Sequence, residues 1–285
     1  MSGKGRIFAN KTPHHDEKDF EIMAPVGSRE SLAAAIKAGA DSIYFGIENL
    51  NMRAHSASTF TIDDLKEMAQ TCAAHGIKSY LTVNTIIDAA KEADISAVIA
   101  SDVAVMMYCR QIGQEVHLST QLNISNIEAL KFYAQFADVV VLARELNMTQ
   151  VADIHRQIEE QRICGPGGEL IRIEMFCHGA LCMAVSGKCY LSLDNTGRSA
   201  NRGACMQICR RGYIVNPKDL KTVRFIDRMM EAGVRVFKIE GRARGPEYVA
   251  TVVGCYQEAI QSVLDGTFTE ENKDGWDERL ARVFN

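Results

Sequence analysis

The chain has 285 residues, of which 47% are apolar and 24% charged, and its net charge is −4. This composition is ordinary for a globular protein that buries its own core, and the negative charge excludes a general attraction to nucleic acid, so any RNA contact must come from a local basic patch. The polar N-terminus lacks the apolar core of a signal peptide, and no apolar run approaches the length of a membrane span, so we expect a cytoplasmic protein. Nine cysteines in that reducing compartment favour metal or redox chemistry over disulfides.

A repeating pattern of short apolar run, turn and helical stretch begins at Phe20, after a predicted flexible tail over residues 1–19. Strands are predicted at 20–26, 42–47, 78–84, 97–102, 115–120, 139–144, 170–176 and 236–241. Helices are predicted at 28–40, 61–76, 88–94, 103–113, 123–136, 147–161, 219–233 and 246–266.

These strand–helix units over residues 20–266 predict an α/β fold, a (β/α)8 TIM-like barrel. Such barrels take about 250 residues and bury both faces of each strand, which gives continuous apolar runs. A doubly wound open sheet is the competing architecture, but no G-x-G-x-x-G motif follows the first strand. A cysteine-rich excursion, 174–211, replaces a simple helix after the seventh strand. Residues 267–285 are polar and are predicted to begin a C-terminal extension whose domain is absent or truncated.

Polar residues follow the predicted strands, at the end of the barrel where enzymes of this fold carry their chemistry. The substrate-binding candidates are Arg53, Asn84, Gln121, Arg144, Arg242 and Arg244. The catalytic candidates are Glu174, His178, Lys238 and Glu240. For any one of them, the simpler explanation is that loops are polar. Lys238 and Glu240 are the exception, because alternate residues of a core strand point the same way and a buried Lys–Glu pair is costly unless function or a hydrogen-bond network keeps it.

Four cysteines in a segment rich in glycine, serine and arginine form a C-x6-C pair and a C-x3-C pair. The four are Cys182, Cys189, Cys205 and Cys209. Disulfides are disfavoured by the compartment, C-x6-C is wide for a zinc knuckle, and a catalytic cysteine needs one thiol with a base. An iron–sulfur cluster takes four thiolates at varied spacing, so we favour it over zinc, which stays open as the alternative. The cysteines predicted to pack in the core are Cys72, Cys109, Cys177 and Cys255.

The segments EMFCHGALC, SGKCYLS and NRGAC together resemble the signature of peptidase family U32, the collagenase-like proteins, and KIEGRARGPEYV and STQLNISN resemble further blocks of that family. The resemblance implies a barrel-like domain and a [4Fe–4S] cluster held by the four cysteines. It also implies a choice of activities. Some members are regarded as oxygen-independent hydroxylases of tRNA uridine, a ribosomal RNA cytidine or a quinone precursor, with prephenate as oxygen donor; others are labelled collagen-degrading peptidases.

The close spacing of Cys205 and Cys209 resembles the RNA-directed members of the family, whereas the chain is shorter than the family pattern near residues 87–88 and 213–216. Our first hypothesis is therefore an iron–sulfur-dependent RNA hydroxylase whose arginines bind phosphate or a carboxylate donor such as prephenate. The second is a collagenase-like peptidase, although the chain has no H-E-x-x-H or G-x-S-x-G motif. The third is a non-catalytic binding or assembly protein.

Overall fold

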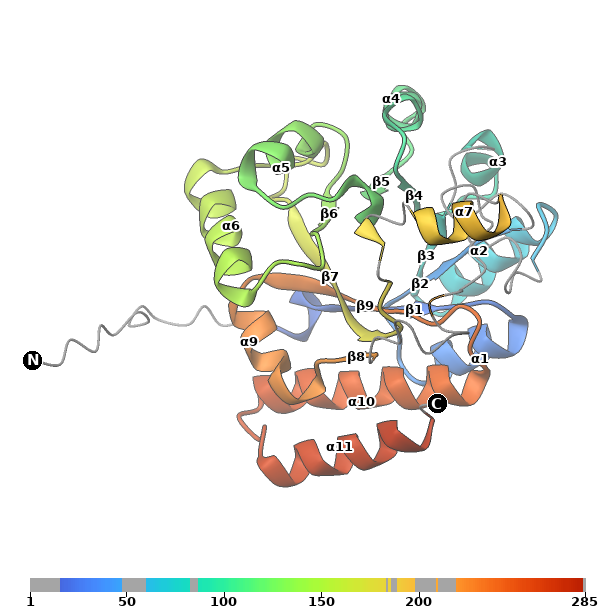
Figure 1. Ribbon diagram of the computed structural model, residues 1–285. Coiled ribbons are helices and arrows are strands. Elements are labelled where there is room, and N and C mark those ends of the chain that lie inside the picture. Colours follow the sequence, from blue (N-terminus) through green and yellow to red (C-terminus); the bar gives the residue numbers. More distant parts are fainter. Residues whose placement is uncertain are drawn as a thin grey trace, which may run out of the picture.

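Parallel strands close into a barrel with helices around its outside (Figure 1). The computed structural model describes residues 16–47, 60–82, 87–182, 184–185, 189–197, 209 and 219–283. The barrel strands are β1 (Glu21–Pro25), β2 (Ser42–Phe45), β3 (Lys78–Thr82), β4 (Ala97–Ala100), β5 (Val116–Leu118), β6 (Val139–Val141), β7 (Arg172–Gly179) and β9 (Val234–Ile239). Each pairs in parallel with the next, and β9 pairs with β1 to close the ring. The predicted (β/α)8 barrel is confirmed.

Helices follow the strands close to where the sequence predicts them, and several begin at a polar side chain that caps the first turn. They are α1 (Arg29–Lys37), α2 (Asp64–Ala74), α3 (Ile87–Glu92), α4 (Val103–Ile112), α5 (Ile127–Ala134), α6 (Met148–Gln161), α7 (Tyr190–Thr196), α9 (Ile226–Glu231), α10 (Pro246–Leu264) and α11 (Glu270–Arg282). The capping box of α6 is an example: the Asn147 side chain accepts from the Gln150 N–H, and the Gln150 side chain accepts from the Asn147 N–H, both at 3.0 Å. Such caps satisfy backbone donors that lack a partner inside the helix.

Both faces of the strands are buried, but the outer face packs against the helices and the inner face packs inside the barrel. The outward-facing side chains, such as Ile22, Phe45 and Phe237, pack with the helices in one large apolar cluster. A smaller cluster fills the inside of the barrel and consists of Met23, Tyr44, Tyr80, Ala97, Ile99, Val139 and Val236. Because side chains alternate along a strand, the side chains two residues away from these also point into the barrel, and most of them are polar.

The helix predicted over residues 219–233 is wrong in its first part. Residues Leu220–Lys221 form the short strand β8, which pairs antiparallel with the end of β7. A 3-10 turn, η5 (Val223–Phe225), and α9 follow. The reason is tertiary: β7 continues to Gly179, and the Thr222 hydroxyl donates to the backbone carbonyl of Cys177 at 2.9 Å. This exposed edge of β7 captures a segment that would otherwise read as helical.

The end of β7 also requires a glycine. Gly179 has φ +104, and a Cβ there would lie 2.4 Å from the carbonyl oxygen of Glu240, the residue that follows β9. Only glycine combines that backbone conformation with so close an approach. The two strands that carry the main candidate residues are therefore held tightly against each other at this end of the barrel.

Residues beyond α10 add a further helix to the outside of the barrel. α11 lies along α10 (Figure 1), where the Trp276 indole N–H donates to Glu258 at 2.9 Å and the ring stacks on Phe268 with centroids 5.8 Å apart. None of the helices in the described ranges combines the length and apolar character needed to cross a membrane.

Candidate functional site

A buried ion pair joins two neighbouring strands inside the barrel. The Nζ of Lys238 on β9 lies 2.7 Å from Oε1 of Glu174 on β7, and the two side chains are 7% and 0% exposed. The ammonium also lies 4.7 Å from the ring centroid of Tyr44 and 5.6 Å from that of Phe176. Removing two charges from water costs more than an average ion pair returns, so the geometry and the two aromatic faces must stabilise this pair.

Glu240 lies on the same side of its strand as Lys238. The Tyr44 hydroxyl lies 3.3 Å from Oε2 of Glu240 and donates to the carbonyl of Ile239 at 2.9 Å. Because Lys238 and Glu240 both contact Tyr44, they share the inward face that strand alternation predicts. The sequence thus predicted the direction of both side chains, but not that Glu174, rather than Glu240, pairs with Lys238.

Two arginines add to this cation at the C-terminal end of the barrel. The guanidinium carbon of Arg144, which follows β6, lies 6.0 Å from the ring centroid of Phe176, and that of Arg242 lies 5.9 Å from Tyr44. Three cations thus surround two aromatic rings; we call Lys238, Arg144, Arg242, Tyr44 and Phe176 the cationic mouth. Three cations against two aromatic rings make the mouth suited to an anionic ligand.

The other substrate-binding candidates lie elsewhere or outside the described residues. Gln121 is half-buried in the 3-10 turn after β5, η2 (Thr120–Leu122). Arg244 lies over the Tyr248 ring at 5.5 Å and 3.7 Å from a carboxylate oxygen of Asp219, so it is placed toward α10 and β8. The remaining two candidates, Arg53 and Asn84, fall outside the described residues.

His178 does not join the cationic mouth. Its Nδ1 lies 3.3 Å from the hydroxyl of Tyr256, and its ring also contacts Tyr248; both tyrosines belong to α10, on the outside of the barrel. A register shift in the pairing of β7 with β9 between Phe176 and His178 breaks the alternation that would have turned His178 inward. Burial lowers the pKa of His178 to about 4, so it is neutral at physiological pH.

The cysteines divide into buried and accessible groups. The core prediction is confirmed for the four that are fully buried, which are Cys72, Cys109, Cys177 and Cys255. Burial raises the pKa of the Cys177 thiol well above its usual range, and the thiol donates to the carbonyl of Lys238 at 3.4 Å. A protonated, buried thiol is a poor nucleophile, so Cys177 and His178 do not form a catalytic pair.

The predicted cluster ligands lie in the segment between β7 and β8, beyond the C-terminal end of β7. Cys182 is exposed, Cys189 and Cys209 are half-buried, and all three are free thiols; Cys205 lies outside the described residues. Cys189 caps α7, where its sulfur accepts the Ser192 backbone N–H at 3.4 Å. The donor chemistry fits a soft metal centre. No three candidate ligands come together within the described ranges, so the cluster stays a prediction.

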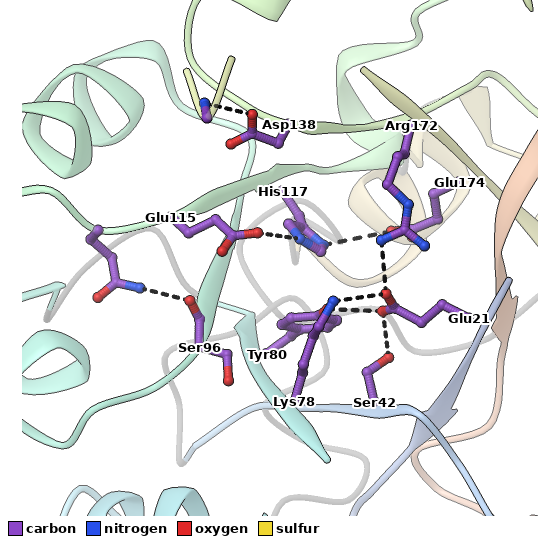
Figure 2. Close-up of polar contacts among 12 residues, drawn as sticks. Glu21, Ser42, Lys78, Tyr80, Ser96, Glu115, His117, Asp138, Arg172 and Glu174 are labelled. Carbon is purple, nitrogen blue, oxygen red and sulfur yellow. Dashed lines mark hydrogen bonds and ion pairs between the residues drawn. The ribbon is translucent and has the colours of Figure 1, made fainter. Parts of the chain in front are cut away.

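A second polar network, inside the barrel near its N-terminal end, was not predicted (Figure 2). Its centre is Glu21 on β1, which accepts from Tyr80 at 2.8 Å and pairs with Arg172 at 3.1 Å and Lys78 at 3.3 Å. Burial alone would raise the pKa of Glu21, but Lys78, Arg172 and His117 outweigh it and lower the pKa to about 2. The sequence carries a signal of this network, because charged residues occupy the first position of otherwise apolar strands. The network was missed because candidates were sought only among residues that follow the strands.

Comparisons with known proteins show the family and support the fold. The model of Peptidase family U32 matches residues 27–285. A protein named "Collagenase" from Porphyromonas gingivalis (strain ATCC BAA-308 / W83) is 64% identical over 94% of this chain and 72% of its own length. The "tRNA hydroxylation protein P1" of Bacillus subtilis (strain 168) is 33% identical over 94% of this chain and 69% of its own length. The solved "Structure of the U32 Peptidase Mk0906" matches 84% of this chain and 98% of that chain, with 12% identity and a TM-score of 0.52, a likeness of fold alone.

Proposed function

The chain belongs to peptidase family U32, and from that premise we propose that it hydroxylates RNA, with a tRNA uridine as the target, at the cationic mouth of its barrel. The observation that carries the proposal is the arrangement of Lys238, Arg144 and Arg242 around the rings of Tyr44 and Phe176. The relative named as a tRNA hydroxylation protein supports the choice of RNA over other anionic substrates.

The chemistry of the mouth suits a planar, negatively charged substrate. Aromatic faces stack on bases, and guanidinium groups bind phosphate or carboxylate through paired N–H donors. The Lys238 ammonium has three N–H donors and spends one on Glu174 at 2.7 Å, which leaves donors for a substrate oxygen. A base must be unstacked before it can enter such a site, and the bases of an anticodon loop are already exposed.

A [4Fe–4S] cluster is part of this proposal, and zinc is its alternative. Its ligands would be Cys182, Cys189, Cys205 and Cys209, and when bound it would supply a soft metal centre that binds or activates a substrate. A dicarboxylate such as prephenate is the proposed oxygen donor, because oxygen-independent hydroxylation needs another source of the oxygen atom. Arg144 and Arg242 are the residues of this chain that would bind its carboxylates.

The test is the modified nucleoside in a strain that lacks the gene. We expect mass spectrometry of its tRNA to show loss of a hydroxylated uridine, restored by the wild-type gene but not by Lys238→Met or Cys189→Ser. Lys273→Met is the matched control, because Lys273 also lies over an aromatic ring, that of Phe268 at 4.3 Å, but on the surface helix α11. An unchanged nucleoside profile in the deletion strain would remove the proposal.

A second candidate function rests on the 64% identity to a protein named "Collagenase". The buried Cys177 and the outward-facing His178 do not favour a cysteine peptidase, but Glu174 and Glu240 both face the barrel interior and are candidates for acid and base. Gelatin cleavage by anaerobically purified protein separates the two functions. Cleavage that is lost in Glu174→Gln would favour the peptidase, whereas no cleavage alongside RNA hydroxylation would exclude it.

A further inference from the structure

A line of polar side chains runs through the barrel from the Lys238–Glu174 pair to the partly exposed Glu115 at the opposite end. Figure 2 shows the part of this line from Glu174 through His117 to Glu115. Oε1 of Glu174 binds Lys238, while its other oxygen, Oε2, lies 4.0 Å from Nδ1 of His117 on β5. Nε2 of His117 lies 3.3 Å from Oε1 of Glu115, whose side chain is 49% exposed. Because Glu115 precedes β5, it lies at the N-terminal end of the barrel, whereas Lys238 lies near the C-terminal end.

The two facing atoms are the unusual feature of this line. Among the described residues, Nδ1 of His117 and Oε2 of Glu174 are both buried and make no hydrogen bond. Leaving a buried polar group unbonded destabilises the fold, so a purely structural pair would be expected to close the gap. A shift of about 1 Å would bring the two atoms to hydrogen-bond distance.

Among the groups that face His117, Glu115 is placed to accept the proton of Nε2. The ring of Tyr80, on β3, lies 4.3 Å from the His117 ring, centroid to centroid. The Glu21 carboxylate acts on His117 from β1, but it is already paired with Lys78 and Arg172. The hydrogen bond with His117 lowers the pKa of Glu115, so Glu115 is ionised and accepts that hydrogen bond. Only Glu115 connects His117 to solvent in these described contacts.

We propose that His117 is a positioning residue through which the Lys238–Glu174 pair exchanges a proton with solvent at the N-terminal end of the barrel. The proposal rests on the proposed function only in treating that pair as the reacting centre. It gives a role to a histidine, the side-chain type that can carry a proton on either ring nitrogen, inside the barrel. The mouth can then be filled by substrate while protons leave at the other end.

The proton balance closes over one forward transfer. Lys238 gives a proton to Oε1 of Glu174, and rotation of the protonated carboxyl presents it to Nδ1 of His117. Nε2 of His117 releases its own proton to Glu115, which passes it to solvent. Lys238 takes a new proton from the substrate, and His117 is left as the Nδ1–H tautomer. A transfer in the opposite direction, from Glu115 to Glu174, restores the starting tautomer. In the forward transfer one proton leaves the mouth, and every side chain ends with its starting charge.

The first test does not depend on activity. In nitrogen-15 NMR of histidine-labelled, anaerobically purified protein, with the His117 signals assigned by their loss in His117→Gln, we expect neutral His117 to carry its proton on Nε2. That proton should exchange with water about tenfold more slowly in Glu115→Gln, because an amide cannot relay it. Glu159→Gln is the matched control, since Glu159 lies 3.5 Å from Nε2 of His155 on α6, away from the barrel interior. A proton on Nδ1, or equal exchange rates in wild type and Glu115→Gln, would overturn the proposal.

The second test uses the hydroxylation reaction. Glu115→Gln should lower kcat about tenfold and leave KM unchanged, while Glu159→Gln should change neither by more than about twofold. An unchanged kcat in Glu115→Gln would contradict the relay even if RNA is hydroxylated. If wild type hydroxylates no RNA, the proposed function fails, and the NMR experiment alone decides whether His117 connects the pair to solvent.

Discussion

Replacing Glu174 by glutamine tests whether the Lys238–Glu174 pair is as tightly coupled as its geometry indicates. Both side chains are at least nine-tenths buried and their charged atoms lie 2.7 Å apart, so solvent screens the pair little. Removing one partner of a buried pair costs about 3–5 kcal/mol, because the other charge stays buried. The rings of Tyr44 and Phe176 still hold the ammonium, each through a contact worth up to about 1–2 kcal/mol, so we expect the lower end, about 3 kcal/mol, or a fall in Tm of about 5 °C.

The assay is urea unfolding of wild type, Glu174→Gln, Lys238→Met and the double variant. The double variant should recover most of the loss, because it leaves no unpaired charge, and the coupling energy should exceed about 2 kcal/mol. Glu128→Gln is the surface control. The charged atoms of Glu128 and Lys131 lie 2.9 Å apart, close to the distance in the buried pair, but the two side chains are 76% and 37% exposed. This substitution should lower the free energy of unfolding by less than about 1 kcal/mol. A Glu174→Gln cost no larger than that of this control would refute the reasoning.

Two further predictions concern groups outside the cationic mouth. Glu21 has its pKa lowered from 4.5 to about 2, so its contribution, about 3 kcal/mol, is present above pH 4.5 and is lost as the pH falls toward 2. Urea unfolding of wild type should therefore lose more stability between pH 5 and pH 3 than that of Glu21→Gln; equal losses would contradict the network. In native protein stripped of metal, iodoacetamide should modify Cys182 and Cys189 at least tenfold faster than Cys177, whose buried thiol is protonated. Mass spectrometry that finds Cys177 modified first would show that the end of β7 is open.

The sequence was sufficient to predict the barrel because its strands are buried on both faces and alternate with helices, several of which begin at a capping side chain. It failed where contacts between distant segments decide local structure. Leu220–Lys221 is a strand because β7 extends past the barrel, and no local pattern carries that information. His178 was a catalytic candidate because it follows the seventh predicted strand. It faces α10 instead, since a register shift between β7 and β9 turns it away from the barrel interior.

The candidate site was predicted in part. The alternation of side chains in a strand was sufficient to place Lys238 and Glu240 on one face. The sequence of one strand does not show which strand lies beside it or in which register. Glu174 was therefore not recognised as the partner of Lys238. His117 was missed because the candidates were residues that follow the strands, whereas His117 lies within the strand β5. The four predicted cluster ligands stay a prediction, because Cys205 lies outside the described residues.

RNA hydroxylation by the purified protein is the most direct measurement of the central claim. Anaerobically purified wild-type protein would be incubated with tRNA from the deletion strain and with prephenate, and the nucleosides would be analysed by mass spectrometry. We predict a uridine heavier by one oxygen atom, formed by wild type and Lys273→Met but not by Lys238→Met. No change in any nucleoside, with protein that retains its iron and sulfide, would contradict the account.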